Sequence, residues 1–267
     1  MNYNFLIIGG DKRMGMLAQK LKDDGNKVKT FANKVEDINE LDSIEDIYKS
    51  NYDVVISSLP LTKDNINVYT PLSNKKISLQ ELKKISKDKI LITGNDILSD
   101  EATTILNTIP TAEGAIQVAM EETNFALHNS KALVLGFGRV GKILCSKLKG
   151  IGMDVYCEAR KDSDLAWIKA YGYKEIPLEK LKENICKMDI VFNTIPFQIL
   201  DKSTLILMSK ETLIIDLASY PGGVDYEAAE KLGIKAILAS ALPGKVAPDT
   251  ASEYIKEYVY RKLENKK

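Results

Sequence analysis

A chain of 267 residues is long enough for two medium-sized domains, each with its own hydrophobic core. Its 37 basic side chains balance 37 acidic ones, so we expect neither a nucleic-acid partner nor a membrane surface, both of which require a basic excess. No apolar run approaches the roughly 20 residues of a membrane span, and three cysteines without metal-ligand spacing indicate a cytoplasmic protein with reduced thiols and no metal.

Short β-branched runs alternate with amphipathic helical stretches along the chain, and the pattern occurs twice. The runs at residues 6–9, 53–60 and 91–94 in the first half are echoed by runs at 133–136, 189–196 and 213–216 in the second. Alternation of this kind is typical of βαβ units on a parallel sheet. The sequence therefore predicts an α/β protein with two doubly wound Rossmann-like domains and a cleft between them.

The boundaries of these domains follow from the repeat. Residues 1–111 form the first domain, which we assign to the substrate side. Residues 112–247 form the dinucleotide domain and begin with a bridging helix over 112–128, a stretch without proline. Apolar residues at helical spacing after Pro248 predict a terminal helix over 248–267. By analogy with other two-domain dehydrogenases, we expect this helix to pack back on the first domain.

A glycine fingerprint follows the first predicted strand of the second domain. Gly136 permits a tight turn, Gly138 lets a pyrophosphate approach the backbone, and Gly141 lets helix and strand pack closely. N–H groups at the start of the helix, at Arg139 and Val140, then bind the phosphates. The same motif without this context is weak, and a Rossmann-type domain that has lost its ligand is the alternative.

Residues at the end of the second strand of this domain distinguish NAD from NADP. A cation there accommodates the 2′-phosphate of NADP, whereas an acid holds the ribose hydroxyls of NAD. Arg160 and Lys161, with Ser163 two residues beyond, favour NADP. Glu158 keeps NAD open, although strand alternation puts its side chain on the same face as Arg160, with which it pairs in the simplest interpretation.

The first repeat has lost the fingerprint at one position. Gly9 corresponds to Gly136, but Asp11 stands where Gly138 stands, and a carboxylate there repels a pyrophosphate. The cluster of Asp11, Lys12 and Arg13 follows a strand, at the edge where ligands of such sheets bind, and Arg13 has the shape for bidentate capture of a carboxylate. A solvated surface role is the simpler interpretation of Lys12.

Further loops end predicted strands of both sheets and complete the expected cleft. In the second domain, the loops at 193–196, 217–223 and 241–248 are predicted to cover the nicotinamide side of the cofactor. The residues of these loops that we assign to the cofactor are Thr194, Ile195, Pro196, Leu217, Ala218, Ser219, Pro243, Gly244 and Val246. Each Pro-Gly pair by itself is ordinary loop punctuation.

Two titratable residues flank the bridging helix. His128, the single histidine, lies at its predicted end, where a cap or a dipole contact is the simpler role than catalysis. Glu113 near its start is either a partner of the helix dipole or an acid of the substrate site.

These motifs together resemble the A subunits of dipicolinate synthase from spore-forming bacteria, and the resemblance runs nearly end to end. The matching motifs are Gly9-Gly10-Asp11-x-Arg13, Leu59-Pro60, Thr111-Ala112-Glu113-Gly114-Ala115, His128-Asn129-Ser130, Gly136-x-Gly138-Arg139-x-Gly141, Ala159-Arg160, Asn193-Thr194-Ile195-Pro196, Asp216-Leu217-Ala218-Ser219-x-Pro221-Gly222-Gly223 and Leu242-Pro243-Gly244-x-Val246-Ala247-Pro248. Two departures are Asn129, where the family usually has glycine, and the additional acid Glu158.

The resemblance implies NADP-dependent oxidation of a dihydro- or 4-hydroxytetrahydro-dipicolinate to pyridine-2,6-dicarboxylate in the mother cell of a sporulating bacterium. It also implies a flavoprotein-like partner, the B subunit, in a hetero-oligomer, with a homodimer as the other expected assembly. Arg13 would bind a substrate carboxylate, while Asp11 would hold Arg13 or move a proton, and Glu113 is the third candidate for catalysis. The residues expected to contact the dicarboxylate are Gly10, Asp11, Arg13, Pro60, Glu113 and Gly114.

Two other functions stay open. A reductase like shikimate dehydrogenase or methylene-tetrahydrofolate dehydrogenase shares the two-domain form and an arginine-type NADP loop. A regulatory module that binds NADP without turnover needs only the glycine fingerprint, and not the cluster at Asp11 and Arg13.

Overall fold

The computed structural model describes residues 2–219 and 221–265, and the chain divides into two compact units. Unit 1 comprises Met1–Asn107 and Pro243–Lys267, and unit 2 comprises Thr108–Leu242. The first boundary falls shortly before the predicted residue 111. The chain re-enters unit 1 at Pro243, whereas the predicted second domain extends to residue 247.

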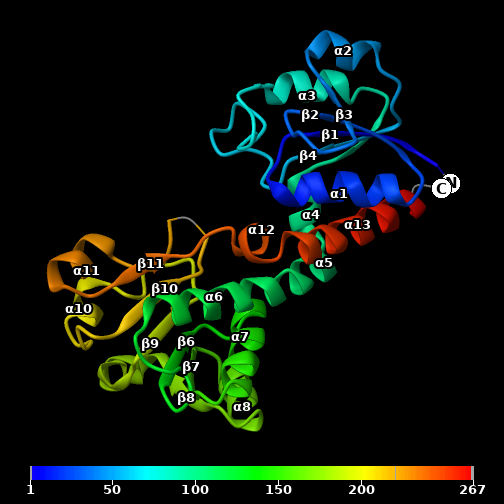
Figure 1. Cartoon of the computed structure of the whole chain (residues 1–267). Helices are drawn as coiled ribbons and strands as arrows, with labels where there is room; N and C mark the ends of the chain where they lie inside the picture. Colours follow the sequence, from blue (N-terminus) through cyan, green and yellow to red (C-terminus); the bar gives the residue numbers. More distant parts are fainter. Residues whose placement is uncertain (1, 220, 266–267) are drawn as a thin grey trace. The chain divides into compact units, whose positions relative to one another are not determined.

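Unit 1 is built on five parallel strands in the order β3-β2-β1-β4-β5 (Figure 1). The strands are β1 (Asn4–Ile8), β2 (Lys27–Phe31), β3 (Asn39–Leu41), β4 (Val54–Ser57) and β5 (Ile90–Ile92). The helices are α1 (Lys12–Asp23), α2 (Ile44–Lys49), α3 (Leu79–Ile85), α4 (Gly94–Ser99), α5 (Glu101–Leu106) and α13 (Pro248–Glu264). The strand order reverses between β1 and β4, which is where ligands of such sheets bind.

Helices cover both faces of this sheet, so its central strands are continuous apolar runs. Helices α1 and α13 lie side by side over one face, while α2 and α3 supply apolar side chains to the other (Figure 1). Ile255 and Val259 of α13 are fully buried against α1 and the sheet. Each such side chain stabilises the unit by roughly 1.5–3 kcal/mol, so the terminal helix is part of the core of unit 1.

Unit 2 carries six parallel strands in the order β11-β10-β9-β6-β7-β8. The strands are β6 (Lys131–Leu135), β7 (Asp154–Ala159), β8 (Lys174–Pro177), β9 (Ile190–Asn193), β10 (Leu213–Asp216) and β11 (Ala236–Leu238). The helices are α6 (Thr108–Glu122), α7 (Arg139–Gly150), α8 (Asp162–Ala170), α9 (Leu181–Asn184), α10 (Lys202–Leu205) and α11 (Tyr226–Leu232), with 3-10 turns η1 (Leu178–Lys180) and η2 (Ile185–Lys187). The short helix α12 (Leu242–Val246) begins at the last residue of unit 2 and continues in unit 1.

This arrangement is the full doubly wound order, with the reversal between β6 and β9. Helices α6, α7 and α8 pack on one face of the sheet, and α9, α10 and α11 pack on the other (Figure 1). The predicted fold class, two Rossmann-like domains with parallel sheets, is confirmed. The sequence repeat is also explained, because β1, β4 and β5 in unit 1 hold the places of β6, β9 and β10 in unit 2.

The helix predicted over residues 112–128 runs instead from Thr108 to Glu122, entirely within unit 2. Its start was misplaced because Pro110 lies in the first turn, where a missing N–H costs nothing. It ends early because the Thr123 hydroxyl donates to the Ala119 carbonyl at 2.7 Å and closes the last turn. The residues up to Ser130 then form turns that lead into β6.

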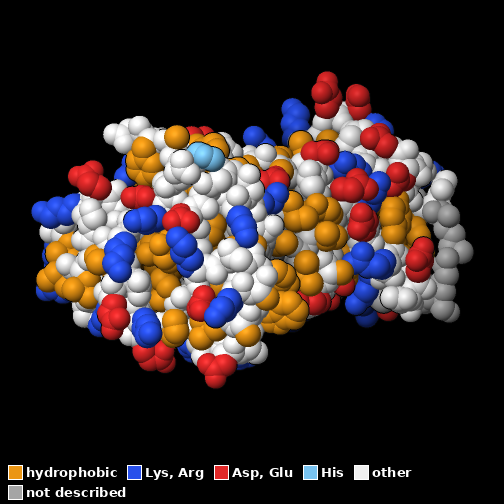
Figure 2. Space-filling model, turned by 90° about the horizontal axis from the view of Figure 1, so that it is seen from below, with side chains coloured by type: hydrophobic (Ala, Val, Ile, Leu, Met, Phe, Trp, Pro, Cys, Tyr) orange, Lys and Arg blue, Asp and Glu red, His pale blue; other side chains and the backbone are white. Residues whose placement is uncertain are grey.

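The surface mixes both signs of charge. On the face shown in Figure 2, basic and acidic side chains are interspersed with apolar ones, as the balanced composition requires. No helix within the described ranges 2–219 and 221–265 is long and apolar enough to cross a bilayer.

Candidate functional site

The glycine loop of unit 2 leaves the start of α7 open. Gly138 is the N-cap of α7 and makes no side-chain capping bond, and a Cβ built on it would meet nothing within 4 Å. The first N–H groups of this 12-residue helix therefore have no capping side chain. Uncapped N–H groups together with the helix dipole favour an anion, so this loop fits the pyrophosphate of a dinucleotide.

Gly136 joins this loop to the neighbouring loop after β9. It has a φ of 91°, and a Cβ there would lie 2.8 Å from Oγ1 of Thr194 and 2.9 Å from Cγ1 of Ile195. The Thr194 hydroxyl also donates to the Leu135 carbonyl at 2.8 Å. The two loops at the reversal of strand order are thus fixed to each other, and only glycine fits at position 136.

The other predicted cofactor residues of unit 2 line the same edge of the sheet. Arg139 and Val140 form the first turn of α7, and Gly141 packs against the backbone of Gly136. The segment at 217–219 follows β10, and the Ala218 N–H donates to the buried Asp216 carboxylate at 3.1 Å.

The cationic side chains after β7 are accessible. Arg160, Lys161 and Ser163 are all exposed, whereas Glu158 is 1% exposed. Within residues 2–219 and 221–265 no ion pair joins Glu158 to Arg160, so the pairing suggested by strand alternation is not seen. The guanidinium of Arg160 is therefore available to a ligand at this end of the loop.

Glu158 points beneath the glycine loop instead. Its Oε2 accepts the Gly136 N–H at 3.2 Å, and its Oε1 is buried without a partner among the described residues. Burial raises the pKa of this carboxyl above its ordinary value, although the Gly136 N–H and the positive charge of Arg160 act in the opposite direction. The carboxyl therefore lies beneath the glycine loop and not at the solvent-exposed surface.

We expect Glu158→Gln to change how stability depends on pH. A raised pKa in the folded state means that the favourable contribution of the protonated carboxyl is full below about pH 4.3, the unfolded value, and is lost as pH rises through the folded value. Glutamine does not ionise, so the variant avoids this loss. Its free energy of unfolding, compared with that of the wild type, should therefore be higher at about pH 8 than at about pH 4.5, by on the order of 1 kcal/mol. Urea unfolding at both pH values measures this difference.

The matched control is Glu175→Gln, because Glu175 lies opposite Cys157 on the adjacent strand but is exposed. It should leave the pH profile unchanged. A wild-type profile parallel to that of Glu158→Gln would mean that burial does not hinder the ionisation of Glu158.

The corresponding edge of unit 1 is closed by its own side chains. Asp11 is the N-cap of α1 and accepts the Arg13 N–H at 3.0 Å. The Arg13 guanidinium donates to both Asp11 oxygens, with Nη2 at 2.7 Å from Oδ2, and Nη2 also donates to the Leu59 carbonyl at 3.0 Å. The Asp11 carboxylate thus occupies the N-terminus of α1, whereas the N-terminus of α7 has no capping side chain.

Arg13 is only 6% exposed, and its Nε and Nη2 atoms are used within unit 1. No hydrogen bond of Nη1 is found among the described residues, so this is the atom left for a ligand. Gly244 covers the pair, since a Cβ on Gly244 would lie 2.7 Å from Oδ2 of Asp11 and 3.0 Å from Nε of Arg13. Pro243, Gly244 and Val246, which the sequence assigned to the cofactor, thus belong to unit 1.

A second buried side chain holds this loop. The Asn33 amide donates to the carbonyls of Gly9 at 3.0 Å and Gly10 at 3.3 Å. Pro60 follows Leu59 through a cis peptide bond, and the Leu59 carbonyl accepts from Arg13. Gly10, Arg13 and Pro60 are therefore neighbours at one edge of unit 1.

The remaining candidates lie elsewhere. Glu113, in α6, is exposed and pairs with Lys147 of α7 at 2.7 Å, and Gly114 beside it is buried. The His128 imidazole lies over Gly152, at the edge of the sheet where β6 begins, opposite the glycine loop. Asn129 has a φ of 65°, a left-handed conformation that explains a usual glycine at that position.

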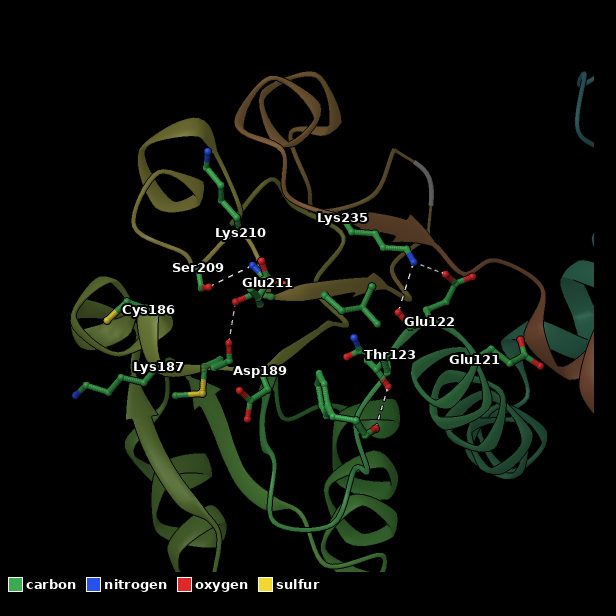
Figure 3. A pocket seen from close by; sticks show the side chains of 15 residues that line it. Glu121, Glu122, Thr123, Cys186, Lys187, Asp189, Ser209, Lys210, Glu211 and Lys235 are labelled. Atoms are coloured by element: carbon green, nitrogen blue, oxygen red, sulfur yellow. Dashed lines mark hydrogen bonds and ion pairs between the residues drawn. The ribbon is translucent and has the colours of Figure 1, made fainter.

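A pocket of about 750 Å³ is also at this opposite edge of unit 2 (Figure 3). It is lined by the end of α6 and by residues before β9, β10 and β11, with Lys235 paired to Glu122. Ligands of doubly wound sheets bind at the carboxyl ends of strands, so this pocket is not the dinucleotide site. Within the described part of the chain, His, Cys, Asp and Glu side chains form no group with metal-ligand geometry.

Two family models match the chain. Residues 4–106 match the N-terminal domain of the dipicolinate synthase A subunit, and residues 109–224 match the NAD-binding domain of D-isomer specific 2-hydroxyacid dehydrogenases. The dipicolinate synthase A subunit of Bacillus subtilis (strain 168) is 39% identical over 211 residues, which cover 77% of this chain and 68% of that protein. The chain belongs to the family of dipicolinate synthase A subunits.

Solved structures of dipicolinate synthase A subunits agree with this assignment. The protein from Bacillus halodurans is 30% identical, with a TM-score of 0.85 over 98% of this chain and 97% of that one. The protein from Bacillus subtilis is also 30% identical, with a TM-score of 0.84 over 99% and 97%. The resemblance noted in the sequence is confirmed, and the protein is an NAD(P)-dependent oxidoreductase of the dipicolinate synthase family.

The sequence missed residues that hold the site together. Asn33, Asn193, Asp216 and Tyr226 are hydrogen-bonded beneath the loops, and none of them was assigned a role. Their signal was position alone, since Asn193 and Asp216 end strands, Asn33 follows one, and Tyr226 begins a helix. Nothing in the sequence shows which of these side chains point at one another.

Proposed function

We propose that this protein is an NADP-dependent dehydrogenase that oxidises a dihydro- or 4-hydroxytetrahydro-dipicolinate to pyridine-2,6-dicarboxylate. The observation that carries the proposal is the open start of α7 at Gly138, set beside the exposed Arg160, in a member of this family. Bound NADP supplies a hydride acceptor, and the protein has to hold it and orient the ring of the substrate.

The choice of NADP is supported by the side chains after β7. Arg160 and Lys161 are exposed at the place where a 2′-phosphate is read, and Ser163 adds a hydroxyl near the start of α8. The acid that argued for NAD, Glu158, is buried and engaged with Gly136. Because the Glu158 carboxyl is engaged in this way, Arg160 and Lys161 are the charged groups that we assign to the ribose end of the cofactor.

Binding of the dicarboxylate is assigned to the edge of unit 1. Arg13 is held by Asp11, so its planar guanidinium has one orientation, and Nη1 is the atom that would donate to a substrate carboxylate. Asp11 then acts by fixing Arg13, although a role in proton transfer is also assigned to it. Gly10 and Pro60 lie beside Arg13, whereas Glu113 and Gly114 in α6 have only the family resemblance in their favour.

The chemical step needs little acid–base assistance. Oxidation of the dihydro compound removes a hydride and a proton, and the 4-hydroxy compound also loses water. Formation of an aromatic ring makes both sequences downhill, so a strong base is not required. The flavoprotein-like B subunit is the partner that we assign to the complex in the mother cell of a sporulating bacterium.

Reconstitution tests this function. The purified protein, mixed with the B subunit, NADP and freshly generated substrate, should give equal amounts of NADPH, read by its absorbance, and pyridine-2,6-dicarboxylate, read by chromatography. The same panel includes shikimate and methylene-tetrahydrofolate as competing substrates.

Two outcomes would reject the proposal. Turnover of shikimate or methylene-tetrahydrofolate in place of the dipicolinate precursor would assign a different reductase activity. Tight NADP binding without any product, with the B subunit present, would identify a regulatory module that binds the cofactor without turnover.

A further inference from the structure

We propose that Tyr226, Asp216 and Asn193 form a positioning network that fixes the loop at 194–196 beside the glycine loop for hydride transfer. None of the three is assigned to contact the substrate or the cofactor, so they are positioning residues. The inference rests on the proposed function, because it takes the loops at 194–196 and 217–223 as the rim beside the nicotinamide.

Asp216 is the centre of the network. It is fully buried at the end of β10 and accepts four hydrogen bonds. The Asn193 amide donates to Oδ1 at 2.8 Å, and the Tyr226 hydroxyl donates to Oδ2 at 2.9 Å. Backbone N–H groups of Ala218 and Gly223 complete the set at 3.1 Å and 2.9 Å. Four donors compensate a buried carboxylate for the loss of water, which makes the arrangement rigid.

Asn193 transmits this order to the loop after β9. Its side-chain oxygen accepts the Ile195 N–H at 3.1 Å, and its amide donates to the Ile195 carbonyl at 3.0 Å. Thr194, between them, donates to the Leu135 carbonyl at 2.8 Å and contacts Gly136. A continuous chain of contacts thus runs from Tyr226 at the start of α11 to the glycine loop.

The glycine pair at positions 222 and 223 makes room for this network. A Cβ on Gly222 would lie 2.6 Å from Oδ2 of Asp216, and one on Gly223 would lie 2.7 Å from the Ile195 carbonyl. Any larger residue would push the carboxylate or the loop out of place. The space that the two glycines leave is filled by the network itself.

Tyr226 is the outermost member and the one best suited to a test. Burial, followed by its bond to Asp216, raises the pKa of its phenol above the ordinary value, so it stays a donor at all working pH values. Tyr226→Phe removes only this donor and keeps the ring. The phosphate and ribose contacts expected at α7 and Arg160 involve none of the three residues.

The expected result for Tyr226→Phe is a kcat about tenfold lower in the reconstituted assay, with the Kd for NADP changed less than about twofold, because a small displacement of the rim costs hydride transfer more than binding. The Kd is read from Trp167, the single tryptophan, whose ring stacks on Tyr171 and thereby connects to Phe137 of the glycine loop. Hydrogen exchange of the Thr194 and Ile195 amides, the exchangeable backbone positions of the loop at 194–196, should also be faster in the NADP complex of the variant.

The matched control is Thr212→Val, which deletes a buried hydrogen bond of similar length, 2.8 Å to the Met188 carbonyl, at the opposite edge of the same sheet. It should lower stability to a similar extent and leave both kcat and loop exchange unchanged. Equal exchange at 194–196 in the wild type and Tyr226→Phe overturns the inference, whether or not turnover is seen. A wild type that binds NADP and makes no product overturns the proposed function instead.

Discussion

Gly138→Asp should abolish dinucleotide binding while leaving the fold intact. The change rebuilds in α7 the arrangement that unit 1 has in α1, where Asp11 caps the helix and occupies its N-terminus. An aspartate at position 138 would take the free N–H groups and repel the pyrophosphate. Each lost charge-assisted hydrogen bond is worth about 1.5–3 kcal/mol, so affinity should fall more than about a hundredfold. Titration of Trp167 fluorescence with NADP measures it.

The stability of the Gly138→Asp variant should increase, although its affinity for the dinucleotide falls. Gly138 has a φ of −79°, and a Cβ there meets nothing within 4 Å, so aspartate fits without strain and gains a cap worth about a few tenths of a kcal/mol over glycine. Gly138→Asn is the matched control for charge, because asparagine is isosteric with aspartate and caps the helix equally well but does not repel the pyrophosphate. It should therefore weaken binding less than aspartate does. If the aspartate variant kept wild-type affinity, the start of α7 would not be the phosphate site.

Arg160→Ser should lower affinity for NADP by about tenfold to a hundredfold and leave affinity for NAD nearly unchanged. The reason is that a bidentate guanidinium–phosphate contact is worth about 1.5–3 kcal/mol, and NAD lacks the phosphate. Arg160 is exposed and forms no ion pair within the described ranges, so its loss should not disturb the fold. Calorimetric titration with both dinucleotides gives the ratio.

Lys187→Ser provides the control for net charge, since Lys187 lines the pocket at the opposite edge of the sheet. It should change neither affinity. Equal losses for NAD and NADP in Arg160→Ser would show that Arg160 binds the shared part of the cofactor. In that case the cation at this position would not select NADP.

Much of the architecture was available from local patterns. Apolar runs such as residues 133–135 predict buried parallel strands, because both faces of such strands are covered by helices. The glycine at 138 and the aspartate at 11 already distinguish the two helix termini, since capping depends on neighbouring residues. Helix ends were less accurate, as in α6, where the predicted start at residue 112 left out Pro110, which lies in the first turn.

The orientation of side chains at the site could not be predicted from the sequence. Arg13 has the same shape in the sequence whether it faces a substrate or Asp11, and only the fold shows that most of its donors are already used. Glu158 was expected beside Arg160, but it turns under Gly136. The Glu158 contact joins segments 22 positions apart in sequence, and Arg13 combines a local contact to Asp11 with one to the Leu59 carbonyl, 46 positions away.

The two parallel sheets, the dinucleotide loop and the family could all be predicted from the amino-acid sequence, because they depend on apolar periodicity and on short motifs whose geometry is local. Which polar groups are free for a ligand depended on the folded arrangement. Burial and long-range hydrogen bonds tied Arg13 to the Leu59 carbonyl, turned Glu158 under Gly136, and joined Asn193 to Asp216 across 23 positions of sequence. Those contacts form only when separate strands end at the same edge of one sheet.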